Sequence, residues 1–185
     1  MGKDGRPPHS RRGADLTYVW GVDEAPTPAD SAERLAFLSG TSFFGGLPPP
    51  LAARLAALVH ERRFSAGDTV FSEGEPGKSM YIVGSGELIL RRHCGTGEET
   101  RLQMMRRGDF FGVTALIDME PRPFSCVAER DSVLYELTNA GLYQLYKEDL
   151  KGYVLVLQNV NRELSRRLRK AASRISALEE LLHKR

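Results

Sequence analysis

Residues 110–116 read FFGVTAL, and after a short gap residues 121–123 read PRP. The aromatic pair is typical of a strand, Gly112 permits a sharp turn, and the four residues after it suit a short helix. Amide N–H groups at the start of such a helix favour an anion, and the guanidinium of Arg122 can donate two hydrogen bonds to phosphate oxygens. This stretch therefore predicts a phosphate-binding loop.

The sequence around this loop, over residues 63–137, alternates between apolar and polar residues and is interrupted by turns that contain glycine. The predicted strands are 69–71, 80–83, 87–91, 100–105, 124–128 and 133–137. A parallel sheet would need helices between its strands. The pattern therefore favours a mainly β fold, an antiparallel β-roll or jelly roll, with flanking helices.

Helical spacing precedes the strands. Residues 31–40 place Leu35 and Leu38 on one face, and residues 50–62 repeat the spacing after a tight connector at 42–48. The apolar positions of the second segment are Leu51, Leu55, Leu58 and Val59. Two short helices are therefore expected before the sheet.

Three segments carry a family resemblance: RFSAGDTVFSEGEPGKSMYIV at 63–83, Ser85-Gly86, and RGDFFG at 107–112. Together they closely resemble the cyclic nucleotide-binding domain family, over roughly residues 31–175. The resemblance implies a β-roll with short helices before it, a hinge helix after it and a long C-terminal helix. The family includes bacterial transcription regulators, kinase regulatory subunits and channel gating domains.

The resemblance also implies a ligand, a cyclic nucleotide such as cAMP or cGMP, bound in the loop described above. The implied site residues are Phe111, Gly112, Val113, Thr114, Ala115, Leu116, Arg122 and Pro123. Arg122 matches the arginine that pairs with the phosphate. Val113 stands where the family has a glutamate that accepts from the ribose hydroxyl, and Pro123 stands where a backbone N–H usually donates to the phosphate.

These two replacements predict a degenerate site. Each lost hydrogen bond costs about 1 to 3 kcal/mol, enough together to weaken a micromolar ligand into the millimolar range. Thr114 and Glu120 are possible substitutes for the glutamate, although Thr114 better suits a helix cap and Glu120 a solvated turn. Arg122, flanked by prolines that favour extended backbone, is either preset for an anion or a structural residue tied to Asp118 or another carboxylate.

Residues 149–185 predict a long helix with a coiled-coil seam. Leucine or alanine recurs every seven residues from Leu150 to Leu178, and a second set from Val154 to Leu182 is offset by four. The expected dimer contacts are Leu157, Asn161, Leu164, Leu168, Ala171, Ile175, Leu178 and Leu182. Asn161 suits a register-fixing polar position, so we expect a parallel homodimer.

Composition excludes several classes of protein. The 185 residues suit one core, residues 31–148, and offer no run long enough for a membrane span or a signal peptide, so a cytoplasmic protein is expected. The four histidines lack metal-ligand spacing, no catalytic arrangement is visible, and Cys94 and Cys126 are expected to be reduced thiols. We therefore predict no metal and no enzymatic activity.

Charge and order differ between the ends of the chain. Residues 1–30 are predicted to be a flexible arm whose apolar island around Trp20 either packs on the domain or docks elsewhere. Eight basic and three acidic side chains give residues 162–185 a charge of +5, which is either solvated or attractive to an acidic protein, anionic lipid or nucleic acid. Because the chain ends there, we expect no helix-turn-helix and no sequence-specific nucleic acid binding.

Two functions remain open from the sequence. The favoured one is a non-catalytic, homodimeric signalling or interaction module with a degenerate ligand site and a protein partner. The alternative is a functional sensor of a cyclic mono- or dinucleotide that modulates a protein partner.

Overall fold

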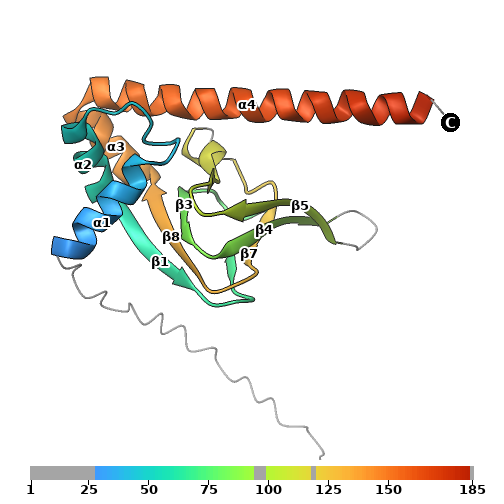
Figure 1. Ribbon diagram of the computed structural model, residues 1–185, viewed down its shortest axis with the longest axis horizontal. Helices are drawn as coiled ribbons and strands as arrows, with labels where there is room; N and C mark the ends of the chain where they lie inside the picture. Colours follow the sequence, from blue (N-terminus) through green and yellow to red (C-terminus); the bar gives the residue numbers. More distant parts are fainter. Residues whose placement is uncertain (1–27, 94–98, 118–119, 184–185) are drawn as a thin grey trace, which may run out of the picture.

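The computed structural model describes residues 28–93, 99–117 and 120–183. In chain order its elements are α1 (Pro28–Ser39), α2 (Pro49–Ala57), β1 (Val59–Phe64), β2 (Thr69–Phe71), β3 (Ser79–Ser85), β4 (Glu87–His93), β5 (Glu99–Arg106), β6 (Phe110–Phe111), the 3-10 helix η1 (Val113–Leu116), β7 (Ser125–Ala128), β8 (Ser132–Thr138), α3 (Asn139–Glu148) and α4 (Leu150–His183). In Figure 1, α1, α2 and α3 gather at one end of the β-roll, while α4 passes over the roll and extends beyond it.

The strands form two four-stranded antiparallel sheets, in the orders β1-β8-β3-β6 and β2-β7-β4-β5. This confirms the predicted antiparallel roll, and all six predicted strands are present. Glycine is required at the turn between β3 and β4. Gly86 has φ of +85°, and a Cβ there would lie 2.1 Å from Oγ of Ser132.

Two hydrophobic cores follow from the alternation of side chains along the strands. On β3, Met80 and Ile82 pack against the helices, while Tyr81 and Val83 face the second sheet. The aromatic pair of β6 is divided in the same way. Phe110 belongs to the core under the helices and Phe111 to the core between the sheets, so the candidate loop begins at a point held from both sides.

The sequence prediction of a helix over residues 50–62 was wrong beyond Ala57. Leu58 caps α2, and β1 then pairs with β8 in register, with Val59 opposite Leu137. Val59 fitted the helical spacing because it is buried in the same core as Leu55. Pairing with a strand that lies far along the chain overrides the local pattern.

Helix α4 is anchored to the connector between α1 and α2 by a buried amide. Asn159 donates through Nδ2 to the carbonyls of Phe43 and Gly45, each at 2.9 Å. Its Oδ1 accepts from Nη1 of Arg162 at 2.7 Å. This residue therefore fixes where α4 crosses the domain.

We expect Asn159→Ala to lower the free energy of unfolding by about 2 kcal/mol, because the carbonyls of Phe43 and Gly45 lose this donor away from water. Urea unfolding followed by circular dichroism measures the change. The neighbouring Gln158 is exposed, so Gln158→Ala is the matched control and should change stability by less than about 0.5 kcal/mol. Equal stabilities for the two variants would contradict the anchoring role.

Some sequence predictions fall outside the described residues. The arm up to residue 27, including the segment around Trp20, lies outside them, as does Cys94. The division of the chain into an arm, a domain at 31–148 and a helix at 149–185 stays a prediction.

Candidate functional site

The predicted loop begins with a left-handed turn at Gly112, where φ is 72° and ψ is 11°. A Cβ at this position would lie 2.6 Å from Nη1 of Arg122, so only glycine leaves room for the guanidinium. The helix that follows, η1, is a single 3-10 turn of 4 residues. The short helix expected from the sequence is therefore present, but its few aligned peptide dipoles attract an anion less strongly than a longer α-helix would.

Arg122 lies under this turn and is only 5% exposed. Its Nη2 donates to the carbonyl oxygen of Ser79 at 2.8 Å, and its Nη1 donates to the carbonyl oxygen of Gly112 at 3.3 Å. The guanidinium carbon also lies 4.1 Å from the centroid of the Phe71 ring. Both ends of the guanidinium are therefore occupied by the protein itself.

The backbone of Arg122 is held as firmly as its side chain. Its N–H donates to the carbonyl of Glu75 at 2.8 Å, and its carbonyl accepts from the N–H of Gly74 at 2.9 Å. An antiparallel bridge joins Pro76 to Pro121 beside these bonds. The turn between β2 and β3 therefore fixes the position of Arg122.

The charge of Arg122 is poorly compensated. Within the described ranges it forms no ion pair, and burial lowers the pKa of its guanidinium from the usual value. Tyr81 lies next to it, with the guanidinium carbon 5.9 Å from the ring centroid. The hydroxyl of Tyr81 accepts from Ser79 and donates to Glu136, each at 3.2 Å, and burial raises the pKa of that hydroxyl. Glu136 thus acts on Arg122 only at a distance.

The remaining predicted site residues separate into buried and exposed groups. Val113 is 2% exposed and Leu116 9%, and both pack in the core under the helices. Thr114, Glu120 and Pro123 are exposed. Thr114 does not cap the helix, because Gly112 holds the N-cap position without a side-chain bond, so that expectation was wrong. Phe111 lies in the core between the sheets, and Ala115 contributes backbone to η1.

The sequence did not single out Ser79, Phe71 and Tyr81 as site residues, although all three contact Arg122. Ser79 and Tyr81 are two residues apart on β3 and therefore share a face of the strand. The sequence did offer one indication of this contact, since Ser79 is a polar residue on the inward face of a strand that is largely apolar.

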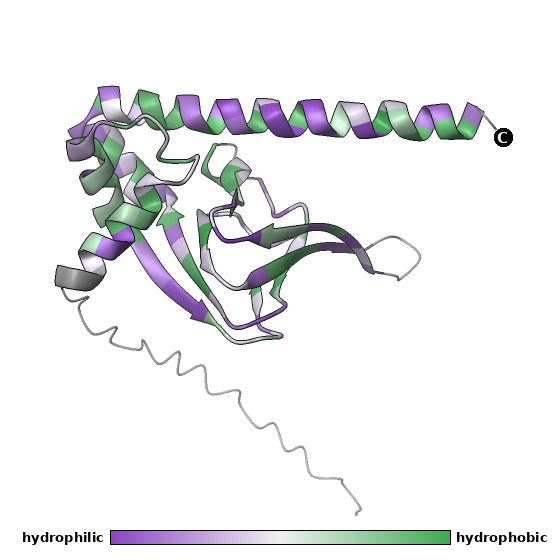
Figure 2. Cartoon of the chain, viewed as in Figure 1, coloured by the Kyte–Doolittle hydropathy of each residue, from purple (hydrophilic) through white to green (hydrophobic). Residues whose placement is uncertain are grey.

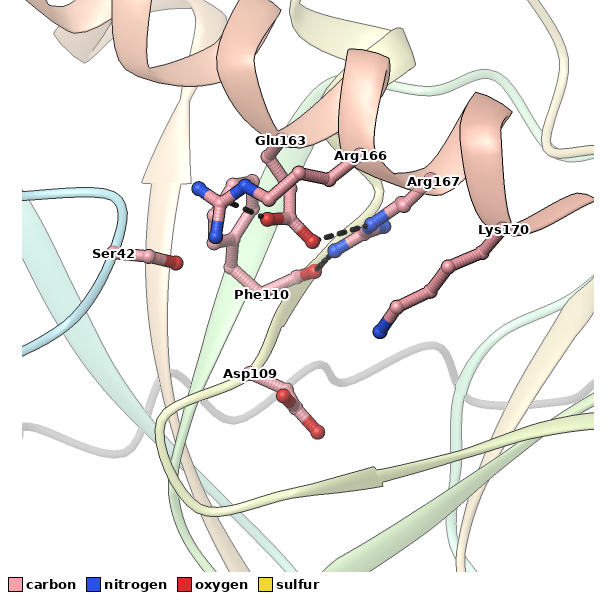
Figure 3. A pocket seen from close by; sticks show the side chains of 7 residues that line it. All are labelled: Ser42, Asp109, Phe110, Glu163, Arg166, Arg167 and Lys170. Carbon is pink, nitrogen blue, oxygen red and sulfur yellow. Dashed lines mark hydrogen bonds and ion pairs between the residues drawn. The ribbon is translucent and has the colours of Figure 1, made fainter.

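Helix α4 contacts the residue that precedes the loop. Arg167 donates from Nη2 to the carbonyl of Phe110, lies over the Phe110 ring at 5.2 Å, and pairs with Glu163 at 2.9 Å. A notch of about 210 Å³ lies beside these residues, between α4 and the turn before β6 (Figure 3). The long helix and the loop are therefore directly connected.

Metal-type clusters and membrane-spanning helices are absent from the part of the chain that the structure describes. No group of three or more His, Cys, Asp or Glu side chains gathers there as a metal site would require, and no helix there is long and apolar enough to cross a membrane. Cys126 is buried, and burial raises the pKa of its thiol to about 12, so it is an unreactive core thiol.

Comparisons with known proteins identify the family that this fold and loop resemble. Residues 61–149 match the family described as "Cyclic nucleotide-binding domain". The cAMP-dependent protein kinase regulatory subunit of Aspergillus niger is 34% identical over 110 residues, which are 60% of this chain and 26% of that protein. The CRP-like cAMP-activated global transcriptional regulator of Mycobacterium tuberculosis is 28% identical over 145 residues, which are 76% of this chain and 61% of that protein.

Among solved structures, the catabolite activator protein of Thermus thermophilus superposes with a TM-score of 0.67 and 29% identity, covering 75% of this chain and 63% of that one. Residues 61–149 of the chain thus carry a domain of the cyclic nucleotide-binding domain family. The chain spans between about a quarter and three fifths of the length of the two curated relatives named above.

Proposed function

We propose that this protein is a non-catalytic regulatory module, homodimeric through α4, that binds cyclic nucleotides only weakly and acts by holding a protein partner. The observation that carries the proposal is the state of Arg122. Its guanidinium is 5% exposed and donates to the carbonyls of Ser79 and Gly112. A phosphate would have to reach a buried group that already donates to two backbone carbonyls.

Val113 and Pro123 support the same proposal. Val113 is in the hydrophobic core and carries no acceptor for a ribose hydroxyl. Pro123 has no N–H to donate to a phosphate. Regulatory relatives support a non-catalytic role in the cytoplasm.

Calorimetric titration of the full chain with cAMP, cGMP and cyclic di-GMP tests the weak site. We expect dissociation constants in the millimolar range, because two hydrogen bonds worth about 1 to 3 kcal/mol each are missing. Binding of any of the three at about 10 μM or tighter would refute the degenerate site.

A second candidate function, a working cyclic nucleotide sensor, is favoured by one observation. Arg122 is a buried cation without an ion pair in the described ranges, and burial lowers the pKa of its guanidinium. An anionic ligand would compensate that charge. In this alternative, ligand binding acts on α4 through Phe110, which Arg167 contacts.

Restoring the missing donor gives a sharper test of why the site is weak. We expect Pro123→Ala to bind cAMP at least about 5 times more tightly than the wild type, because one hydrogen bond to an anion, worth about 1 to 3 kcal/mol, is regained. Ligand-observed NMR titration measures affinities in this weak range. The control is Pro121→Ala, an exposed proline of the same loop, which should leave the affinity unchanged. An equal effect of the two substitutions would mean that loop flexibility, not the missing donor, limits binding.

Exposure along α4 supports the homodimer. Leu168, Ile175, Leu178 and Leu182 are 57% to 72% exposed in the isolated chain, as is Leu181, which the sequence prediction did not include. Asn161 and Ala171 are exposed too, while Leu157 and Leu164 are partly buried. Figure 2 shows hydrophobic residues continuing along α4 where it extends past the roll. A partner helix would cover them.

A further inference from the structure

Helix α4 carries a basic stripe, defined as Arg162, Arg166, Arg169 and Lys170. All four side chains are exposed. At about 100° per residue, the stripe lies on the side of the helix roughly opposite Asn161, Leu168 and Ile175. It therefore stays accessible when the predicted dimer seam is covered.

The stripe borders two hollows. One is the notch of about 210 Å³, where Arg166, Arg167 and Lys170 of α4 face Asp109 and Phe110 of the roll (Figure 3). The other is a shallower hollow of about 490 Å³ lined by Arg162, Arg166 and Arg169 and, at the edge of the predicted seam, by Asn161 and Ser165. Arg166 lines both, so the two hollows form one continuous surface.

The charges in the notch are only partly balanced. Glu163 pairs with Arg166 at 3.4 Å and with Arg167 at 2.9 Å. Asp109 accepts from the backbone N–H of Arg106 at 2.9 Å within its own turn. Lys170 extends from α4 into the notch and forms no ion pair with any residue that the structure describes. Three cations and two carboxylates leave the notch with a formal charge of +1.

The small net positive charge of the notch favours some kinds of anionic partner over others. A single carboxylate neutralises the notch, whereas a phosphate backbone would bring a dense row of charges against Asp109 and Glu163. A lipid surface would need apolar side chains that insert beside the cations. The large exposed apolar side chains of α4 instead belong to the seam side, as at Leu168 and Ile175. The surface therefore fits separated carboxylates.

We propose that the basic stripe binds an acidic segment of a partner protein, with one carboxylate in the notch between Arg166 and Lys170. Further carboxylates of that segment pair with Arg162 and Arg169. The inference rests on the proposed role as an interaction module and names the chemistry of its partner. The test of this inference uses no nucleotide. If the inference fails, the nucleotide titration and the dimer measurement still test the proposed function independently.

The test is fluorescence anisotropy of a labelled 12-residue peptide of alternating glutamate and serine, titrated with the full chain at low ionic strength. A peptide of glycine and serine is the neutral control. We expect Arg166→Glu combined with Lys170→Glu to weaken binding of the acidic peptide about tenfold or more, because two attractive pairs become repulsive. Arg166→Gln combined with Lys170→Gln only removes the two charges, so it should weaken binding of the acidic peptide less than the charge reversal does. If the charge reversal unfolds α4, this neutral variant still tests the proposal.

The matched control is Arg63→Glu combined with Arg130→Glu. It makes the same change in net charge at side chains that are 82% and 74% exposed on the roll. Its affinity for the acidic peptide should stay within about twofold of wild type. Equal weakening by both reversals would overturn the proposal, since binding would then follow net charge alone. Tighter binding, in the same buffer, to a single-stranded oligonucleotide or to phosphatidylserine vesicles would overturn it in favour of those partners.

Discussion

Replacing Arg122 by methionine is expected to lower the free energy of unfolding by about 2 to 3 kcal/mol. The side chain keeps a similar length, but the carbonyls of Ser79 and Gly112 lose their donors in a buried setting. The contact of the guanidinium with the Phe71 ring is lost as well. Part of the loss is offset, because methionine does not carry a charge that burial disfavours. Guanidinium chloride unfolding followed by circular dichroism measures the difference.

Arg130→Met is the matched control for this prediction. Arg130 is 74% exposed and makes one ion pair with Glu87, so its replacement should cost less than about 1 kcal/mol. The opposite pattern would be informative: if Arg122→Met kept wild-type stability but lost nucleotide binding, Arg122 would be a ligand group and the degenerate site would be refuted. Nucleotide that stabilises the wild type and not the variant would point the same way.

Most of the roll could be predicted because each strand is marked by residues within or next to it in the sequence. Glycine-bearing turns and alternating side chains mark each strand, and Gly86 shows why: its positive φ and its close approach to Ser132 exclude other residues. Strand β1 could not be predicted in this way. Its register is set by β8, whose residues lie far along the chain, and Val59 is buried whether it continues a helix or begins a strand.

The sequence pointed to Arg122 as a candidate site residue but not to most of the residues that contact it. The sequence identified Arg122 and left open whether a phosphate, a carboxylate or neither would pair with it. In the structure the guanidinium donates to the carbonyl of Ser79, which lies 43 residues away on β3, and to the carbonyl of Gly112. Asp118, named in advance as a possible partner, lies outside the described residues. Contacts between distant strands decide such a question, and no local spacing records them.

For helix α4, too, the sequence showed one part of its role and the structure another. Its heptad spacing was visible in the sequence, but the face that packs on its own domain, through Val156, Asn159 and Val160, became visible only with the roll in place. That face ends near Arg167, and every side chain from residue 168 to 183 is exposed. A solvated helix of this length is marginal in water by itself. A second helix packed along the exposed segment would therefore add to its stability.

We accordingly expect Leu168→Glu combined with Ile175→Glu to raise the dimer dissociation constant more than about 100-fold, because each substitution buries a carboxylate in the seam. Both residues belong to the same predicted seam position and are 72% and 57% exposed in the single chain, so the substitutions leave the domain itself unstrained. Sedimentation velocity at micromolar concentration should show a dimer for the wild type and a monomer for the variant. The helical circular dichroism signal should fall as the end of α4 loses its support.

Ser173→Glu combined with Ala177→Glu is the control, since it adds the same two charges to α4 at exposed positions roughly opposite the seam. This variant should remain a dimer with an unchanged helical signal. A wild-type protein that sediments as a monomer would show that the seam is not used between copies of this chain. If both variants dissociated equally, added charge on α4 would be responsible and not the seam. Only a loss confined to the Leu168 and Ile175 variant ties the dimer to that face of the helix.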